Sequence, residues 1–128
     1  MASIADNDDV VRQLYDARKR ADFEKAGALL ADDVTWHIPG NWWFSGEYEG
    51  KASVMAYMEK AAEAMKGLVM FEARDLHSSK RHVGTVSHFA HERDGGRTEG
   101  SELVVFRLTD GKIAEAWFFP EYEESNGE

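Results

Sequence analysis

Apolar residues recur at helical spacing in three segments of the first half of the chain. The first segment predicts a helix over about residues 8–19, behind an acidic first turn that suits the helix dipole. The second predicts a short helix that Asp22 can cap and that ends near Asp32 and Asp33. The third follows Gly50 and closes at Gly67, a residue typical of the position after a helix. The stripes of the first and third helices comprise Val10, Val11, Leu14 and Arg18, and Val54, Tyr57, Met58, Ala61 and Met65.

The remaining segments have the composition of strands and turns. Residues 34–38 predict a strand that stops at Pro39, and residues 41–50 predict an aromatic loop because glycines interrupt them. Glycine in the segments 94–97 and 109–112 supplies the positive φ that hairpin turns require. The order predicts an α+β fold in which a curved antiparallel sheet wraps three N-terminal helices. The four strands of the second half are expected over roughly residues 68–78, 81–93, 97–109 and 112–120.

Length and charge narrow the class of protein. At 128 residues the chain has the size of one domain, expected over 1–128 with a core at about 8–120 and an acidic tail at 121–128. A net charge of −9 with scattered Lys and Arg would repel a phosphate backbone, so nucleic acid is not an expected partner. The acidic start and the lack of a long apolar run predict no leader and no membrane span, and we expect a cytoplasmic protein.

The chain lacks the residues that several kinds of chemistry require. The chain has no cysteine, which excludes disulfides, thiolate metal sites and a cysteine nucleophile. We find no phosphate-binding loop and no dinucleotide fingerprint, and therefore expect no cofactor. His82, His88 and His91 are separated by six and by three residues, a spacing that gathers ligands on a helix but not on a strand, so no metal site is expected.

Separated pieces of the chain match one known group of proteins in order and spacing. The pieces are Val10–Tyr15, Ala21–Glu24, Leu30–Gly40, Gly46–Val54 and Phe106–Trp117. Together they resemble SnoaL-like and ketosteroid-isomerase-like proteins of the nuclear-transport-factor-2-like superfamily. The resemblance covers about residues 8–120 and implies a cystatin-like cone around an apolar pocket, in a protein that commonly forms homodimers. It leaves the activity open, because such proteins include isomerases, cyclases, dehydratases, epoxide hydrolases and binders.

The catalytic groups of ketosteroid isomerases are replaced in this chain. Those enzymes use a carboxylate base and an oxyanion hole of a tyrosine and a protonated aspartic acid. By the resemblance, the tyrosine falls at Leu14, with Tyr15 on another face, the base at Ile38 and the acidic donor at Val104. None of these apolar side chains transfers a proton, so we do not expect that mechanism. The acid near the last-strand tryptophan of SnoaL-type cyclases has only Glu121 as a counterpart, and no Asp-Arg-Asp set of an epoxide hydrolase is evident.

Glu102 is the candidate that could replace the missing groups. If Val104 and Phe106 face the pocket, strand alternation directs Glu102 there too, where desolvation would tune its pKa for proton transfer. Alternatively, Glu102 lies wetted at the open end of the sheet or pairs with an arginine. His88 and His91 should point to opposite faces, so only one can be the partner of Glu102, and the alternative is that either faces solvent.

The remaining predicted site residues are aromatic or apolar. His37 should point outward if its neighbours Trp36 and Ile38 point inward. The aromatic loop could form a lid over an apolar ligand or a subunit interface. The predicted wall comprises Leu14, Trp36, Ile38, Tyr57, Met58, Val104, Phe106 and Phe118, although core positions have the same composition, and the predicted lid comprises Trp42, Trp43 and Phe44.

Three functions remain open from the sequence. The first is a cofactor-independent isomerase, cyclase or dehydratase that acts on an apolar cyclic or polyketide-like molecule by general acid–base chemistry. The second is a noncatalytic protein that binds an apolar ligand, and the third is a dimeric association module with a filled cone.

Overall fold

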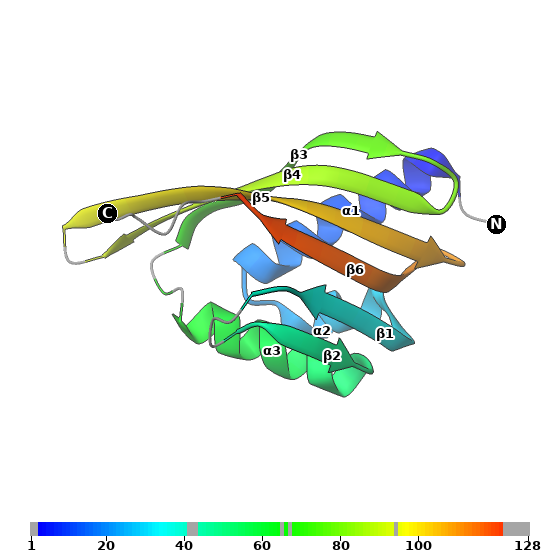
Figure 1. Cartoon of the computed structure of the whole chain (residues 1–128), viewed down its shortest axis with the longest axis horizontal. Helices are drawn as coiled ribbons and strands as arrows, with labels where there is room; N and C mark the ends of the chain where they lie inside the picture. The colour runs from blue at the N-terminus through cyan, green and yellow to red at the C-terminus, as the bar shows by residue number, and fades with distance from the viewer. Residues whose placement is uncertain (1–2, 41–43, 65, 67, 94, 122–128) are drawn as a thin grey trace.

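The computed structural model describes residues 3–40, 44–64, 66, 68–93 and 95–121. Helices occupy mainly the first half of the chain and strands the second, as the sequence predicts (Figure 1). In chain order the elements are α1 (Ile4–Lys19), α2 (Phe23–Ala28), β1 (Leu30–Ile38), β2 (Gly46–Glu49), α3 (Lys51–Ala64), β3 (Leu68–Ser78), β4 (His82–Arg93), β5 (Gly96–Thr109) and β6 (Lys112–Pro120).

The six strands form one sheet with the order β2-β1-β6-β5-β4-β3. The sheet bends around the helices, and the β4–β5 hairpin extends beyond them (Figure 1). All neighbouring strands are antiparallel except β1 and β6, which run parallel with Trp36 opposite Ala116. The sheet is therefore mixed, whereas the sequence predicted an antiparallel one. A parallel pair needs a long connection, and here α3 and four strands separate β1 from β6.

Helix α1 begins earlier than residue 8, where the sequence places its start. Ser3 caps it, because its Oγ accepts a hydrogen bond from the Asp6 backbone N–H at 3.1 Å. The Asp6 carboxylate in turn accepts one from the Ser3 backbone N–H at 3.1 Å. This reciprocal capping box satisfies two backbone donors and extends the helix by one turn.

Two boundaries after α1 also differ from the prediction. Asp22 caps α2 as expected, with its carboxylate accepting from the Lys25 N–H at 3.2 Å, but the helix ends at Ala28 rather than near Asp33. Strand β1 starts directly at Leu30, because the sheet offers β6 as a partner for this stretch. The predicted loop 41–50 contains strand β2, whose Tyr48 lies opposite Trp36.

The four strands of the second half match their predicted positions within two residues. The turn between β5 and β6 is built on Asp110 and Gly111, with φ of 52° and 77°. Two successive positive φ angles define the hairpin turn whose twist suits the strands. Between the sheet and the helices lies one core cluster, which includes Val11, Leu14 and Trp36. Of the helices in the described part of the chain, none is both long and apolar enough to cross a bilayer.

Candidate functional site

The register of β4 and β5 decides which side chains face the helices. Glu102 lies opposite Ser87, Val104 opposite Thr85, and Phe106 opposite Val83. Side chains of directly opposed residues share one face of a sheet. Val104 and Phe106 are fully buried against the helices, so this is the interior face and Glu102 belongs to it. The alternation that places Glu102 inside is therefore confirmed.

The structure does not bring Glu102 together with either histidine candidate. His88 lies opposite Ser101 on β5 and Glu72 on β3, which places it on the outer face. His91 shares the interior face but is four residues along β4 from Ser87, which corresponds to about 13 Å. Its Nδ1 atom is buried without a hydrogen-bond partner. The predicted proton-transfer couple is therefore not assembled, because the pleat excludes His88 and distance separates His91.

Two tyrosines, Tyr15 and Tyr57, interact electrostatically with Glu102 in place of a histidine. Tyr15 was expected on another face than Leu14, yet both are buried, with 3% and 1% of their surface exposed. The Tyr15 ring packs on Phe71 at a centroid distance of 4.8 Å. Burial raises the pKa of Tyr15. A hydrogen bond with Ser87 lowers this pKa, and the charge of Glu102 raises it. Tyr15 thus remains a neutral hydroxyl beside the carboxyl group.

Tyr57 of α3 approaches the same carboxyl group from the other helix. Burial raises its pKa, while the charge of Arg18 lowers it and that of Glu102 raises it again. Its ring lies 4.9 Å from that of Tyr48 and 5.9 Å from that of Trp36, measured between centroids. Two phenol groups that stay protonated can donate hydrogen bonds to an oxygen of a bound molecule.

The interior raises the pKa of the Glu102 carboxyl group into the range that suits proton transfer. Desolvation of its carboxyl group raises the pKa to about 7, and the positive charge of Arg18 acts in the opposite direction. A carboxyl group with such a pKa is populated in both protonation states near neutral pH, which suits a general acid or base. Desolvation therefore raises the pKa of Glu102 as the sequence predicts, without a histidine beside the carboxyl group.

Arg18 is a site residue that the sequence analysis left within the apolar stripe of helix α1. Its guanidinium carbon lies 5.0 Å from the ring centroid of Phe71, 5.5 Å from that of Trp36 and 5.9 Å from that of Tyr57. Cations placed over aromatic faces are attracted by the ring quadrupole. The signal was present in the sequence, since Arg18 follows Leu14 by four residues and therefore shares its face.

The residues of the predicted pocket wall form much of the core in this structure. Seven of them are buried in the core cluster: Leu14, Trp36, Ile38, Met58, Val104, Phe106 and Phe118. The eighth, Tyr57, is partly buried and packs against this cluster. Met58 also lines a cleft of about 230 Å³, which Arg18 borders as well. Of the predicted lid, Trp42 and Trp43 lie outside the described residues. Phe44 packs partly buried on the core, and its carbonyl accepts a hydrogen bond from the Tyr48 hydroxyl at 2.7 Å.

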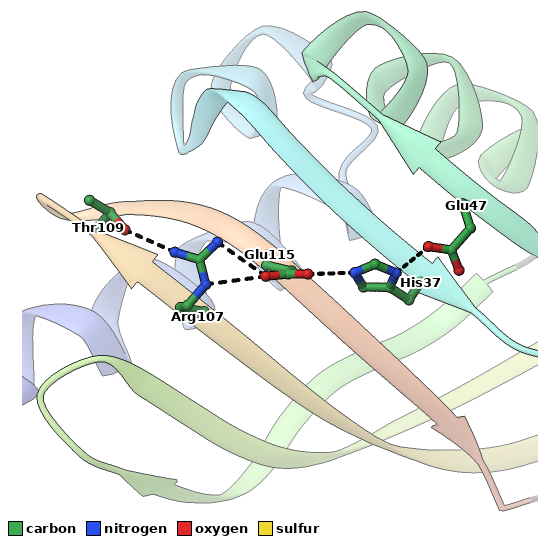
Figure 2. Close-up of polar contacts among 5 residues, drawn as sticks. All are labelled: His37, Glu47, Arg107, Thr109 and Glu115. Atoms are coloured by element: carbon green, nitrogen blue, oxygen red, sulfur yellow. Dashed lines mark hydrogen bonds and ion pairs between the residues drawn. The ribbon is translucent and has the colours of Figure 1, made fainter.

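His37 lies on the outer face, as expected from its buried neighbours. Figure 2 shows its ring between two carboxylates, with Nδ1 bonded to Glu47 and Nε2 bonded to Glu115 at 2.6 Å. Arg107 donates to the same Glu115 carboxylate at 3.1 and 3.2 Å. These residues form a row of paired charges on the side of the sheet away from Glu102. Within the described ranges, no three His, Asp or Glu side chains are arranged to hold a metal ion.

The comparison with protein families decides the assignment. The model of the SnoaL-like domain matches residues 11–116. The chain belongs to the SnoaL-like domain family. A search of curated protein sequences found no match. As a SnoaL-like protein, the chain shares its fold with enzymes and binders alike, so its activity has to be argued from the interior residues.

Solved structures of other proteins share the fold over nearly the whole chain. A protein of unknown function with a cystatin-like fold from Xanthomonas campestris is 28% identical, with a TM-score of 0.76 and 91% of each chain covered. A Jannaschia sp. CCS1 protein described as a SnoaL-like polyketide cyclase is 15% identical, with a TM-score of 0.79 and 94% of this chain and 89% of that chain covered. TerC, co-crystallised with polyporic acid, is 16% identical, with a TM-score of 0.78 and coverage of 91% and 92%.

Proposed function

We propose that this SnoaL-like protein is a cofactor-independent enzyme of isomerase, cyclase or dehydratase type that transfers a proton on an apolar small molecule through Glu102. The observation that carries the proposal is the partly buried Glu102 carboxyl group, whose pKa desolvation raises to about 7. A structural carboxylate gains nothing from such a position, because removing it from water disfavours its charge. A proton-transferring group does gain, since its pKa is matched to neutral pH.

The surroundings of Glu102 fit proton transfer at carbon. Abstraction of a proton beside a carbonyl group leaves negative charge on the carbonyl oxygen, which needs hydrogen-bond donors. Tyr57 is a hydroxyl donor that stays neutral and interacts with the charge of Glu102, and the neutral Tyr15, whose hydroxyl bonds with Ser87, interacts with the same charge. Glu102 would take the proton from one carbon and return it to another, or to a leaving oxygen. Leu14, Ile38 and Val104 stand where ketosteroid isomerases have their catalytic groups. The proposed arrangement of Glu102 with tyrosines therefore differs from the one in those enzymes.

Proteins with the same fold support the class of molecule. One is described as a polyketide cyclase, and TerC was co-crystallised with polyporic acid. We infer by analogy that a cyclic or polyketide-like molecule is the substrate of the present chain. The aromatic side chains of Trp36, Tyr57 and Phe71, which belong to the core cluster or pack against it, are of the kind that bind such a molecule.

Hydrogen exchange of a simple cyclic ketone tests the proposal without knowledge of the natural substrate. The protein should accelerate exchange of the α-protons of β-tetralone in heavy water, followed by mass spectrometry. Glu102→Gln should reduce the acceleration about 100-fold. Glu99→Gln, in the same strand but exposed and paired with Arg97, should leave it unchanged. Equal rates for the wild type and Glu102→Gln would contradict the proposal.

A noncatalytic binding protein is the second candidate. It is favoured by the complete burial of the apolar side chains at the three former catalytic positions, Leu14, Ile38 and Val104. A binder would be stabilised by its ligand through mass action and would release it unaltered. A rise in melting temperature with β-tetralone, without any exchange above the buffer rate, would favour this function over the enzyme.

We further propose that the protein acts as a cytoplasmic homodimer. Leu103 and Phe119 lie opposite each other on β5 and β6, and 37% and 48% of their surface is exposed. Such neighbouring apolar side chains on an outer sheet face support an interface between two copies. Sedimentation of the wild type and of Phe119→Glu tests this, with a shift of the variant toward monomer expected. The lack of cysteine fits a reducing compartment.

A further inference from the structure

A cleft at the end of helix α1 differs in charge from the rest of the molecule. It has a volume of about 230 Å³ and lies among α1, α3 and β3. Among the described residues, three cationic ones line it, Arg18, Lys19 and Lys66, and no acidic one does. The chain as a whole carries a net charge of −9. The other lining residues are apolar and comprise Ala21, Met58, Ala61, Ala62, Leu68 and Phe71.

Arg18 connects this cleft to the interior that contains Glu102. Its guanidinium lies over the rings of Trp36, Tyr57 and Phe71, and it also borders the cleft. Among the described side chains, no carboxylate forms an ion pair with Arg18, whereas Arg20 nearby pairs with Asp16 at 3.3 Å. Arg18 hydrogen-bonds with Tyr57 and interacts electrostatically with Glu102, but a guanidinium that lies over aromatic rings without a carboxylate in direct contact is poised to bind an anion.

A second, independent observation also indicates an acceptor group on the ligand. The Nε1 atom of Trp36 is buried and has no hydrogen-bond partner in the part of the chain that the structure describes, and the residue is fully shielded from solvent. The indole N–H can only donate, and leaving it unsatisfied costs free energy. The Trp36 ring is one of those beneath the Arg18 guanidinium, at 5.5 Å from centroid to carbon. A ligand oxygen near Arg18 would come close to this donor.

We infer that the molecule taken up by this protein is an apolar organic anion, whose acidic oxygen binds Arg18 and whose carbon skeleton packs on Met58, Leu68 and Phe71. The inference deepens the proposed function by naming the substrate class, and it rests on that function for the role of Glu102. Lys19 at the cleft adds a local positive charge that attracts the anion against the net charge of the protein, whereas the charge of Lys66 is paired with Glu63 at 2.8 Å. Carboxylates, phenolates and enolates on a ring system belong to this class.

A matched pair of fluorescent probes tests the preference for an anion. Anilinonaphthalene sulfonate carries a negative charge, and N-phenylnaphthylamine is its neutral counterpart. We expect the wild type to bind the anion more tightly, and Arg18→Gln to weaken that binding about 10- to 100-fold with little effect on the neutral probe. Arg18→Lys should restore part of the affinity, and Arg20→Gln should leave it unchanged. Equal affinity of the wild type and Arg18→Gln for the anion would overturn the inference.

The indole N–H signal of Trp36 reports where the probe binds. In a proton–nitrogen correlation spectrum, assigned with Trp36→Phe, this signal should move when the sulfonate binds to the wild type. A bound sulfonate that leaves the Trp36 signal in place would also overturn the inference, because the anion would then lie elsewhere. Circular dichroism spectra matching the wild type would show that each variant is folded.

Failure of the inference and failure of the proposed function give different results. Glu102→Gln should bind the sulfonate at least as tightly as the wild type, because it removes a negative charge near Arg18. A wild-type protein that prefers the anion but does not accelerate ketone exchange would leave the inference standing while the enzyme proposal failed. Ketone exchange that depends on Glu102, without any preference for the anion, would refute only the inference.

Discussion

Ser87 and Glu102 lie directly opposite each other on β4 and β5, and the Ser87 hydroxyl donates a hydrogen bond to the Glu102 backbone carbonyl at 3.4 Å. Ser87 is buried, and its hydroxyl also bonds with Tyr15. The pairing therefore fixes Glu102 on the interior face, next to a buried tyrosine. A shift of the register by one residue would move the carboxyl group to the outer face.

Replacing Glu102 should stabilise the protein at alkaline pH. Burial raises the folded-state pKa of Glu102 from 4.5 to about 7, so the folded state retains the proton longer than the unfolded state does. The wild type therefore loses stability as pH rises from about 4.5 to 7, by up to about 3 kcal/mol. Glu102→Gln lacks this loss, and its advantage in urea denaturation should grow from small near pH 4.5 to full near pH 8. A constant difference across this range would contradict the argument.

Removing the charge of Arg18 should raise the pKa of Glu102 further. The positive charge of Arg18 is the influence that opposes the effect of burial on this carboxyl group. Arg18→Gln should therefore give a pKa above about 7 in a carbon NMR titration of the Glu102 carboxyl group, whereas Arg18→Lys should stay near the wild-type value. Arg20→Gln is the matched control, because Arg20 is exposed and paired with Asp16. An unchanged titration of Glu102 in Arg18→Gln would disprove the coupling.

His37 should stabilise the fold more at mildly acidic than at alkaline pH. Both of its ring nitrogens bond to carboxylates, of Glu47 and Glu115, and only the protonated ring donates from both. Desolvation lowers the pKa of His37, but the bonds with Glu115 and Glu47 together outweigh it, so that the pKa is raised above 6.5. The contribution is thus complete below about pH 6.5 and is lost as pH rises through the folded-state pKa.

The corresponding measurement compares His37→Gln with the wild type at two pH values. Near pH 6 the variant should be less stable by about 1 kcal/mol, and the difference should shrink near pH 9. The carboxylate of Glu115 has a lowered pKa, mainly through its bond with His37, and remains ionised over this whole range. His82→Gln serves as the control, since the His37 ring stacks on Trp117 at a centroid distance of 5.6 Å and His82 lies near the same ring at 6.4 Å. A difference that grows with pH would rule out the charged form of His37.

Gly100 on β5 should not tolerate a side chain without a rearrangement of Phe89. A Cβ atom added at Gly100 would lie 2.5 Å from Cζ of the opposing Phe89 ring. We expect Gly100→Ala to destabilise the protein by about 1–2 kcal/mol, and Phe89→Leu to relieve much of this in the double variant. Gly84→Ala is the control, because its nearest contact, the His77 carbonyl oxygen, is at an ordinary 3.7 Å. Equal costs for both alanine variants would contradict the steric argument.

The predictions that the structure confirms rest on patterns of neighbouring residues in the sequence. The alternation around Val104 and Phe106 placed Glu102 inside because the side-chain period of a strand is two, whatever its neighbours are. Asp22 capped its helix and Asp110-Gly111 formed the turn, since both depend only on adjacent backbone atoms. The same reasoning placed His37 outward between two buried residues.

Predictions that depended on partners distant in the chain were less successful. Strand β2 was missed because its stability comes from pairing with β1, not from its glycine-flanked sequence. The choice between His88 and His91 needed the register of β4 against both neighbours. Tyr15 and Arg18 were visible as residues, but their roles depend on α1 lying against the interior of the sheet.

The sequence by itself determined the α+β class, most element positions, the SnoaL-like resemblance and the inward direction of Glu102, because periodicity and turn chemistry are short-range properties. Only the tertiary structure decided the parallel pairing of β1 with β6, the separation of Glu102 from both histidines and the position of Arg18 at the cleft. These features depend on burial, pairing and electrostatic fields that arise when segments far apart in the chain come into contact, and no local pattern encodes them.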